Sequence, residues 1–147
     1  MPSDLLATRQ RILAGEWTAS RAVDDAITRA QSPAGRDAFV FPRFDEARAE
    51  AARFDRETPR AAQRPLAGLP FSVKDLFDVQ GQVTAAGSTV LADHPPAAAD
   101  CPAVARLRAA GGSLMGRTHM VEFAFSGMGT NPHVATPAAW DGRHDRP

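Results

Sequence analysis

The sequence predicts an α/β fold, in which helices and short strands alternate along a single domain. Residues 71–116 run strand, loop, helix, strand, an order that indicates a βαβ crossover between two parallel strands. Residues 4–30 carry apolar side chains at helical spacing, which predicts helices before that core. A length of 147 residues allows one domain with a hydrophobic core and is too short to expect two.

Two helices are predicted at the beginning of the chain. Residues 4–14 suit a short amphipathic helix that ends at Gly15. A second helix follows, with Thr18 as its N-cap, and residues 32–35 (Ser-Pro-Ala-Gly) end it. We therefore expect a helical start over residues 1–35.

A brief strand and a third helix come next. Residues 38–41 are predicted to form the strand, and Asp45 is predicted to cap the helix after it. One face of that helix carries its apolar side chains: Ala47, Ala51 and Phe54. Residues 58–65 are expected to be an exposed connector.

The core of the domain is expected over residues 66–130. Its first strand, residues 71–73, ends beside Lys74 and Asp75. Residues 81–99 are rich in glycine, proline and small side chains, which predicts a long irregular loop. A loop of this length inside a compact domain more often has a function than not. A helix with Pro102 in its first turn then leads to a buried strand at residues 113–116.

The last part of the chain shows little regularity. We expect Thr118 to cap a short helix that runs through Phe123, whose helical phase places its ring in the core. Residues 131–147 have several prolines and no apolar periodicity, which predicts an irregular tail.

Lys74 is the only lysine, because sixteen of the 17 basic residues are arginines. A lysine in apolar surroundings can lose its proton and act as a base or nucleophile, which an arginine cannot do. The other interpretation is a packed stem with its ammonium group in water. We expect Phe71, Val73, Leu76 and Phe77 to supply apolar surroundings. Strand alternation turns Asp75 away from Lys74 and places Ser72 on the face of Lys74.

Composition argues against several classes of protein. Acidic and basic residues number 17 each, so no net charge attracts nucleic acid or an anionic membrane. No secretory start or transmembrane stretch is evident, and Cys101 is the single cysteine, so we expect a cytoplasmic protein. We expect no metal and no cofactor, because the four histidines are too widely spaced for a metal motif: His94, His119, His133 and His144.

Several segments, in order, match the pattern of one known family. Residues 68–75 (Gly-Leu-Pro-Phe-Ser-Val-Lys-Asp) are the first. Residues 116–124 are similar to the pattern G-K-T-N-M-x-E-F-A, with Arg117 for the usual Lys and His119 for the usual Asn. Further matches are Thr84, Gly87-Ser88, Asp100, Val104, Leu107, Ala110-Gly111, Asn131-Pro132 and Trp140-Asp141. Together these segments resemble the amidase signature family, whose hydrolases use a Ser, cis-Ser, Lys triad.

This resemblance implies the N-terminal portion of one amidase domain, a mixed β-sheet flanked by helices that is incomplete. Lys74 would be the general base that takes a proton from the bridging serine, which in turn takes one from the nucleophilic serine. A wall of the acyl-binding pocket is implied at four residues, for which the glycine allows close backbone approach: Phe125, Ser126, Gly127 and Met128. The substrate would be a small-molecule amide, without direct contact to nucleic acid or membrane.

In the family, both serines lie in a segment that would follow Pro147. We therefore expect a fragment that is inactive alone and whose partner is the missing C-terminal part or a homodimer mate. Two alternatives remain. The chain is also similar to the A-subunit of the glutamyl-tRNA amidotransferase, which acts with partner subunits on aminoacyl-tRNA, or it is a non-catalytic remnant or interaction module.

Overall fold

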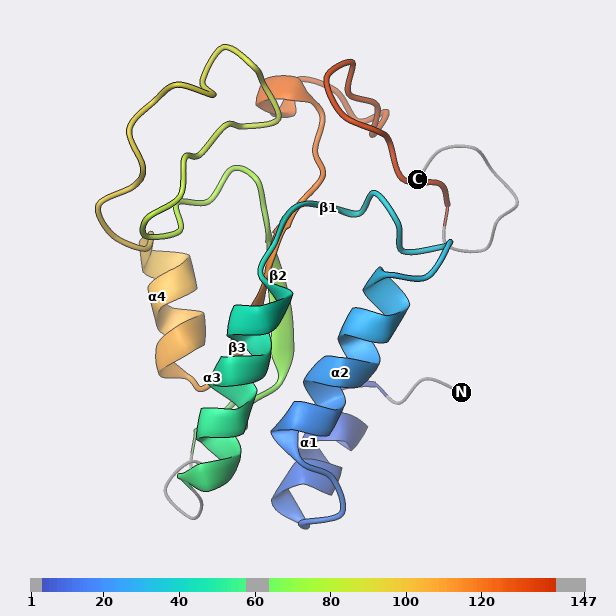
Figure 1. Ribbon diagram of the computed structural model, residues 1–147, viewed down its shortest axis with the longest axis vertical. Helices are drawn as coiled ribbons and strands as arrows, with labels where there is room; N and C mark the ends of the chain where they lie inside the picture. The colour runs from blue at the N-terminus through green and yellow to red at the C-terminus, as the bar shows by residue number, and fades with distance from the viewer. Residues whose placement is uncertain (1–3, 58–63, 140–147) are drawn as a thin grey trace. The chain divides into compact units, whose positions relative to one another are not determined.

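The computed structural model describes residues 4–57 and 64–139, in which helices and short strands form an α/β fold (Figure 1). The chain forms two compact units. The first contains the described parts of Met1–Thr28, Arg43–Phe71 and Arg106–Met115, and the second those of Arg29–Pro42, Ser72–Ala105 and Gly116–Pro147. Among residues 4–57 and 64–139, none of the helices combines the length and the apolar character that a membrane span requires.

The first two helices confirm the predictions. α1 (Leu5–Leu13) begins at Asp4, whose carboxylate accepts the Ala7 N–H at 2.7 Å, and the chain turns at Gly15 with φ 75°. α2 (Ala19–Ala30) begins after Thr18, whose hydroxyl accepts the Arg21 N–H at 3.0 Å.

The third helix begins two residues earlier than predicted. α3 (Phe44–Arg56) is preceded by Arg43, and no side chain caps its N-terminus, so the prediction that Asp45 is the cap is wrong. Asp45 instead lies in the first turn, where a negative charge is favourable to the helix dipole. The predicted apolar face is confirmed, since its three residues are buried: Ala47, Ala51 and Phe54.

In the first unit, α2 and α3 lie side by side (Figure 1). Arg48 binds Asp24 across them at 2.8 Å, and Asp55 accepts the Ala19 and Ser20 N–H groups at the start of α2. The buried apolar residues of this unit include Ala22, Val23, Ile27, Ala47, Phe54, Leu69 and Leu114. This core packs the helices against one another.

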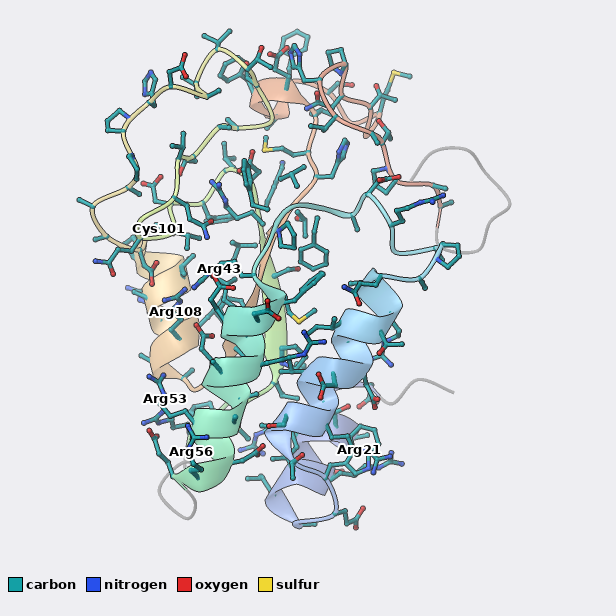
Figure 2. All side chains as sticks on the ribbon, viewed as in Figure 1. Arg21, Arg43, Arg53, Arg56, Cys101 and Arg108 are labelled. Carbon is teal, nitrogen blue, oxygen red and sulfur yellow. The ribbon has the colours of Figure 1, made fainter. Side chains whose placement is uncertain are left out.

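Glu50 connects α3 to two other segments of the first unit. Its Oε2 accepts the Leu114 N–H at 2.9 Å. Its Oε1 lies 3.9 Å from Nη2 of Arg108, on the helix α4 (Pro102–Ala109) (Figure 2).

A three-stranded mixed sheet is formed by β1 (Phe39–Pro42), β2 (Pro70–Lys74) and β3 (Ser113–Thr118), in the order β1-β3-β2. β1 and β3 are antiparallel, with an irregularity in register between Phe39 and Phe41. β2 and β3 are parallel, because the Leu69 carbonyl accepts the Ser113 N–H and, farther along both strands, the Thr118 carbonyl accepts the Asp75 N–H. The predicted parallel pair is therefore confirmed.

The described chain has neither helix nor strand between β2 and α4, which confirms the predicted long loop. Reciprocal backbone bonds join residues 81–82 to Ala97: Gly81 donates to Ala97, and Ala97 donates to Gln82, both at 2.9 Å. Cys101 also donates its N–H to the Asp78 carbonyl at 3.0 Å. These bonds close the loop on itself.

The predicted helix from Thr118 through Phe123 is wrong. Thr118 ends β3 in extended conformation, held by the Asp75 N–H on its carbonyl. Only a short 3₁₀ turn, η2 (Glu122–Ala124), follows, with Phe123 at φ 51°. The Phe123 side chain is 51% exposed, so its predicted place in the core is also wrong. Residues 131–139 contain no helix or strand, and residues 140–147 of the predicted tail, with Trp140, Asp141 and Pro147, lie outside the described residues, as do residues 58–63 of the predicted connector.

Candidate active site

A pocket of about 380 Å³ in the second unit opens beside the end of β2. Lys74 contributes the ammonium group, and the segment after β3 contributes most of the remaining wall. The lining residues are Ala38, Lys74, Thr118, His119, Met120, Val121, Ser126, Gly127, Gly129 and Pro137.

Strand alternation places Lys74 as the sequence predicts. Val73 and Asp75 are buried, whereas Ser72 and Lys74 are exposed on the other face. The expected apolar surroundings are not found, because Lys74 is exposed, and Leu76 and Phe77 are themselves 47% and 39% exposed. The physical reason is local: β2 is an edge strand of this sheet, and the chain turns at once, with the Phe77 N–H donating to the Lys74 carbonyl at 3.1 Å.

Behind Lys74 lies a buried ion pair. Nη1 of Arg117 lies 3.0 Å from Oδ1 of Asp75, and both side chains are at most 2% exposed. Asp75 Oδ2 accepts the Gly87 N–H at 3.0 Å. Burial raises the pKa of Asp75 above its ordinary value, although the Gly87 hydrogen bond and the Arg117 charge oppose that shift. Burial likewise lowers the pKa of Arg117, against the charge of Asp75.

His119 and Gly129, two other lining residues of the pocket, are hydrogen-bonded to each other. Its Nε2 lies 2.8 Å from the Gly129 carbonyl oxygen, and because a carbonyl only accepts, Nε2 must carry the proton. Nδ1 is buried and has no hydrogen-bond partner among the described residues. In the segment between His119 and Gly129, the Met128 N–H donates to Ser126 Oγ at 3.1 Å.

The structure brings only some of the predicted site residues together. Lys74, Ser126 and Gly127 line the same pocket. Phe125 and Met128 do not line it, and their side chains are 94% and 60% exposed. The chain after η2 carries both side chains to the surface of the described unit.

Sequence reasoning did not assign a role to Asn131, which is buried. Its Nδ2 donates to the Gly87 carbonyl at 2.7 Å and to the Met120 carbonyl at 2.8 Å. Its Oδ1 accepts the His133 N–H at 2.8 Å. The sequence signal that could have pointed to a structural role for Asn131 is the proline directly after it, since Asn-Pro pairs favour turn formation.

Glu122 connects two further polar side chains. Its Oε1 accepts the Ser88 hydroxyl at 2.6 Å and lies 2.9 Å from His133 Nε2. Because a carboxylate only accepts, His133 Nε2 carries a proton in this contact. The hydrogen bonds from Ser88 and from His133 lower the pKa of Glu122.

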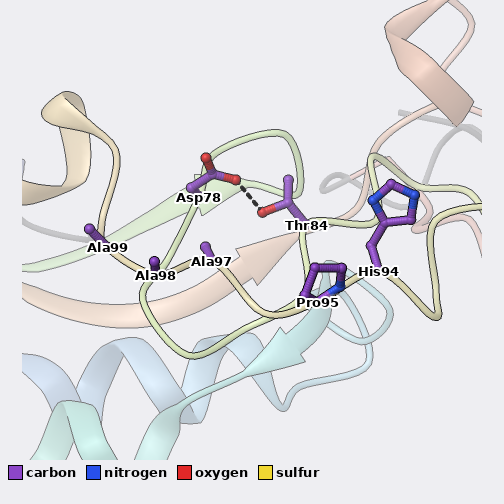
Figure 3. A pocket seen from close by; sticks show the side chains of 7 residues that line it. All are labelled: Asp78, Thr84, His94, Pro95, Ala97, Ala98 and Ala99. Carbon is purple, nitrogen blue, oxygen red and sulfur yellow. Dashed lines mark hydrogen bonds between the residues drawn. The ribbon is translucent and has the colours of Figure 1, made fainter.

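A second pocket, of about 430 Å³, lies within the long loop of the same unit (Figure 3). The Thr84 hydroxyl donates to Asp78 Oδ1 at 2.6 Å, which occupies one oxygen of the only carboxylate lining it. The other lining residues are His94, Pro95, Ala97, Ala98 and Ala99. Among the described residues, no group of three or more His, Cys, Asp or Glu side chains is placed to hold a metal ion.

Comparison with known proteins identifies relatives of this chain. The chain is 40% identical over 124 residues to AtzE, a 1-carboxybiuret hydrolase subunit of Pseudomonas sp. (strain ADP), covering 83% of this chain and 27% of the relative. It is 36% identical over 141 residues to the glutamyl-tRNA(Gln) amidotransferase A-subunit of Synechococcus sp. (strain CC9605), covering 94% of this chain and 28% of the relative.

A solved structure is similar over nearly the whole chain. It belongs to a vestigial protein complex described as revealing the evolutionary origins of an s-triazine catabolic enzyme, and it superposes with a TM-score of 0.85 at 36% identity. The match covers 92% of this chain and 30% of that one, so the chain spans less than a third of the length of these relatives. The family model for Amidase matches residues 21–144. This chain therefore belongs to the amidase family.

Proposed function

We propose that this chain supplies the general base of an amide-hydrolysing enzyme and that Lys74 is that base. The observation that carries the proposal is that Lys74 lines one pocket with Ser126 and Gly127, in a chain of the amidase family. The reaction is hydrolysis of a small carboxamide through an acyl-enzyme, which releases ammonia or an amine and then the acid.

The proposed proton route begins at the Lys74 amine. The neutral amine accepts a proton from a bridging serine, which accepts the proton of the nucleophilic serine as that oxygen attacks the carbonyl carbon. Water later frees the acyl group. Lys74 is exposed in the described chain, whereas this proton transfer needs a site from which water is excluded. The proposal therefore requires the Lys74 pocket to be covered, and dried, in the active enzyme.

We assign both triad serines to amidase sequence outside residues 1–147, and we propose that these residues alone do not turn over amides. The family relatives support this assignment, since the chain spans only 27% of the first and 28% of the second. Ser126 is proposed as a substrate-positioning residue, with Gly127 beside it. Phe125 and Met128 take part in the same wall once the pocket is covered.

The second candidate function is that of an amidotransferase subunit that passes ammonia to aminoacyl-tRNA with partner subunits. The match to the Synechococcus amidotransferase favours it, because that match covers 94% of this chain. For either function we propose a cytoplasmic location, which cell fractionation would check. Ammonia release that depends on an aminoacyl-tRNA acceptor would select the second candidate over the first.

The test of Lys74 uses the longest natural polypeptide that contains residues 1–147. Lys74→Met removes the amine, and Lys74→Arg keeps the charge but cannot act as a base. Both variants are expected to lower kcat for ammonia release from small carboxamides by about 10²–10⁴-fold, with far-UV circular dichroism unchanged.

Ser72→Ala is the matched control, because Ser72 lies on the same face of β2 two residues away. It is expected to leave kcat within about threefold, an effect below about 1 kcal/mol. A Lys74→Arg enzyme that keeps more than a tenth of the activity would refute the base assignment.

A further inference from the structure

Asp75, the residue next to Lys74, is held from several directions at once. Its N–H donates to the Thr118 carbonyl at 3.1 Å, and its own carbonyl accepts the Ala86 N–H at 3.0 Å. Its carboxylate binds the Gly87 N–H and the Arg117 guanidinium, both at 3.0 Å. The backbone that places the Lys74 stem is therefore fixed by its neighbour, although the Lys74 side chain is exposed.

Arg117 makes contacts that a lysine could not make together. Nη1 pairs with Asp75 and also donates to the Val83 carbonyl, while the guanidinium plane lies over the Phe41 ring, 4.2 Å from its centroid. A planar guanidinium offers several donors and a stacking face, whereas an ammonium group is a compact point charge. Arg117 thus joins β1, the end of β2 and the start of the long loop.

The same network continues to Met120, another lining residue of the pocket. Gly87 donates its N–H to Asp75 and accepts from Asn131, which also donates to the carbonyl of Met120. Gly87 has φ 68°, and a Cβ there would lie 2.8 Å from Asn131 Nδ2, so the position favours glycine on two grounds. Asp75, the neighbour of the lining residue Lys74, is thus connected to Met120, another lining residue, through part-buried and buried hydrogen bonds.

We propose that Arg117 is a positioning residue for Lys74, acting through the buried carboxylate of Asp75. The claim that Arg117 contributes to catalysis rests on the proposed function. The claim that Arg117 fixes the position of Lys74 does not rest on it. A misplaced catalytic group slows the chemical step without weakening substrate binding. Loss of Arg117 is therefore expected to lower kcat and to leave KM unchanged.

The only lysine of the chain provides a selective probe. Labelling with [¹⁵N]lysine gives one backbone amide signal, from Lys74, in the full 147-residue chain. Arg117→Met is expected to displace this signal by more than its linewidth or to broaden it, at temperatures well below melting. Arg108→Met, which removes the arginine of the Glu50 ion pair in the first unit, is the matched control and is expected to leave the signal in place.

A second variant separates positioning from stability, since Arg117→Met leaves Asp75 buried and unpaired. The double variant Asp75→Leu/Arg117→Met replaces the ion pair with apolar side chains, which is often neutral or stabilising. It is expected to recover most of the melting temperature that Arg117→Met loses, because no charge is left buried and unpaired. The Lys74 signal is expected to stay displaced, because the Gly87 N–H and the Val83 carbonyl still lack their partners. In the longest natural polypeptide, the double variant is expected to lower kcat about 100-fold at unchanged KM.

Superimposable Lys74 signals in wild type and the double variant would overturn the proposal, and so would recovery of kcat together with stability. If Arg117→Met does not fold, the Lys74 signal and the kcat of the double variant are sufficient to test the proposal. An active Lys74→Arg enzyme would remove the proposed function but leave a displaced Lys74 signal, so the two failures are distinguishable.

Discussion

Replacement of Gly68 by alanine tests the packing immediately before the Lys74 strand. Gly68 has φ 77°, and its N–H donates to the Gly111 carbonyl at 2.8 Å. A Cβ at this position would lie 2.4 Å from the Cβ of Ala19 and 3.1 Å from the ring of Phe54. Both neighbours are buried, so neither can move away freely.

The expected cost has two parts. An alanine in the left-handed region costs about 1–2 kcal/mol. Forcing a methyl group into a packed core costs about 1–3 kcal/mol more. Gly68→Ala should therefore lower the free energy of unfolding by about 2–5 kcal/mol. Gly15 isolates the first part, because it has φ 75° but nothing within 4 Å of an added Cβ.

The assay is urea unfolding of both variants, followed by far-UV circular dichroism and analysed at a common slope. Gly15→Ala is expected to cost about 1–2 kcal/mol, and the excess for Gly68→Ala measures the collision with Ala19 and Phe54. Equal costs within about 0.5 kcal/mol would refute the packing argument, because conformation alone would then explain both.

Two further predictions concern polar contacts. The hydrogen bonds of Ser88 and His133 lower the pKa of Glu122, so its stabilisation is fully present above the ordinary value of 4.5 and is lost as pH falls through the lower folded value. Melting temperatures should then separate wild type from Glu122→Gln above that pH and converge at acid pH; a constant difference would contradict the linkage. Asp55→Ala removes the acceptor of two N–H groups at the start of α2 and should cost about 1–2 kcal/mol in urea unfolding. Asp45→Ala, at an almost fully exposed side chain, should change stability by at most about 0.5 kcal/mol, and equal effects of the two would argue against the capping role.

The regular elements were predictable because their signals are local. Helical spacing and an N-cap at Thr18 suffice for α2, and strand alternation correctly separated Lys74 from Asp75. The segment after β3 was predicted wrongly because Thr118 is both a plausible helix cap and a good strand residue. Its partner across the sheet, Asp75, decides between them, and that pairing is not visible in a local window.

The site was predicted less completely than the fold. The sequence named Lys74, Ser126 and Gly127, which line one pocket, but it left open whether the Lys74 ammonium group lies in apolar surroundings or in water. An apolar run predicts burial only if another element covers it, and β2 is an edge strand of the described sheet. Asp75 and Arg117 lie far apart in the sequence. Opposite charges alone do not show which acidic residue pairs with which arginine.

The closed base of the long loop has a consequence for how this protein can change. Gly81 and Gln82 are joined to Ala97 by reciprocal bonds, and the contacts that the long loop makes with Asp75 and Asp78 come from residues 83–87, so the chain between Ser88 and Ala97 can lengthen or shorten without moving either aspartate. Doubling the length of a flexible loop costs only about 0.6 kcal/mol. The stretch around Val90, whose side chain is 74% exposed, is therefore a place where insertions and sequence drift are tolerated, and where a reporter peptide could be introduced with the lysine strand undisturbed.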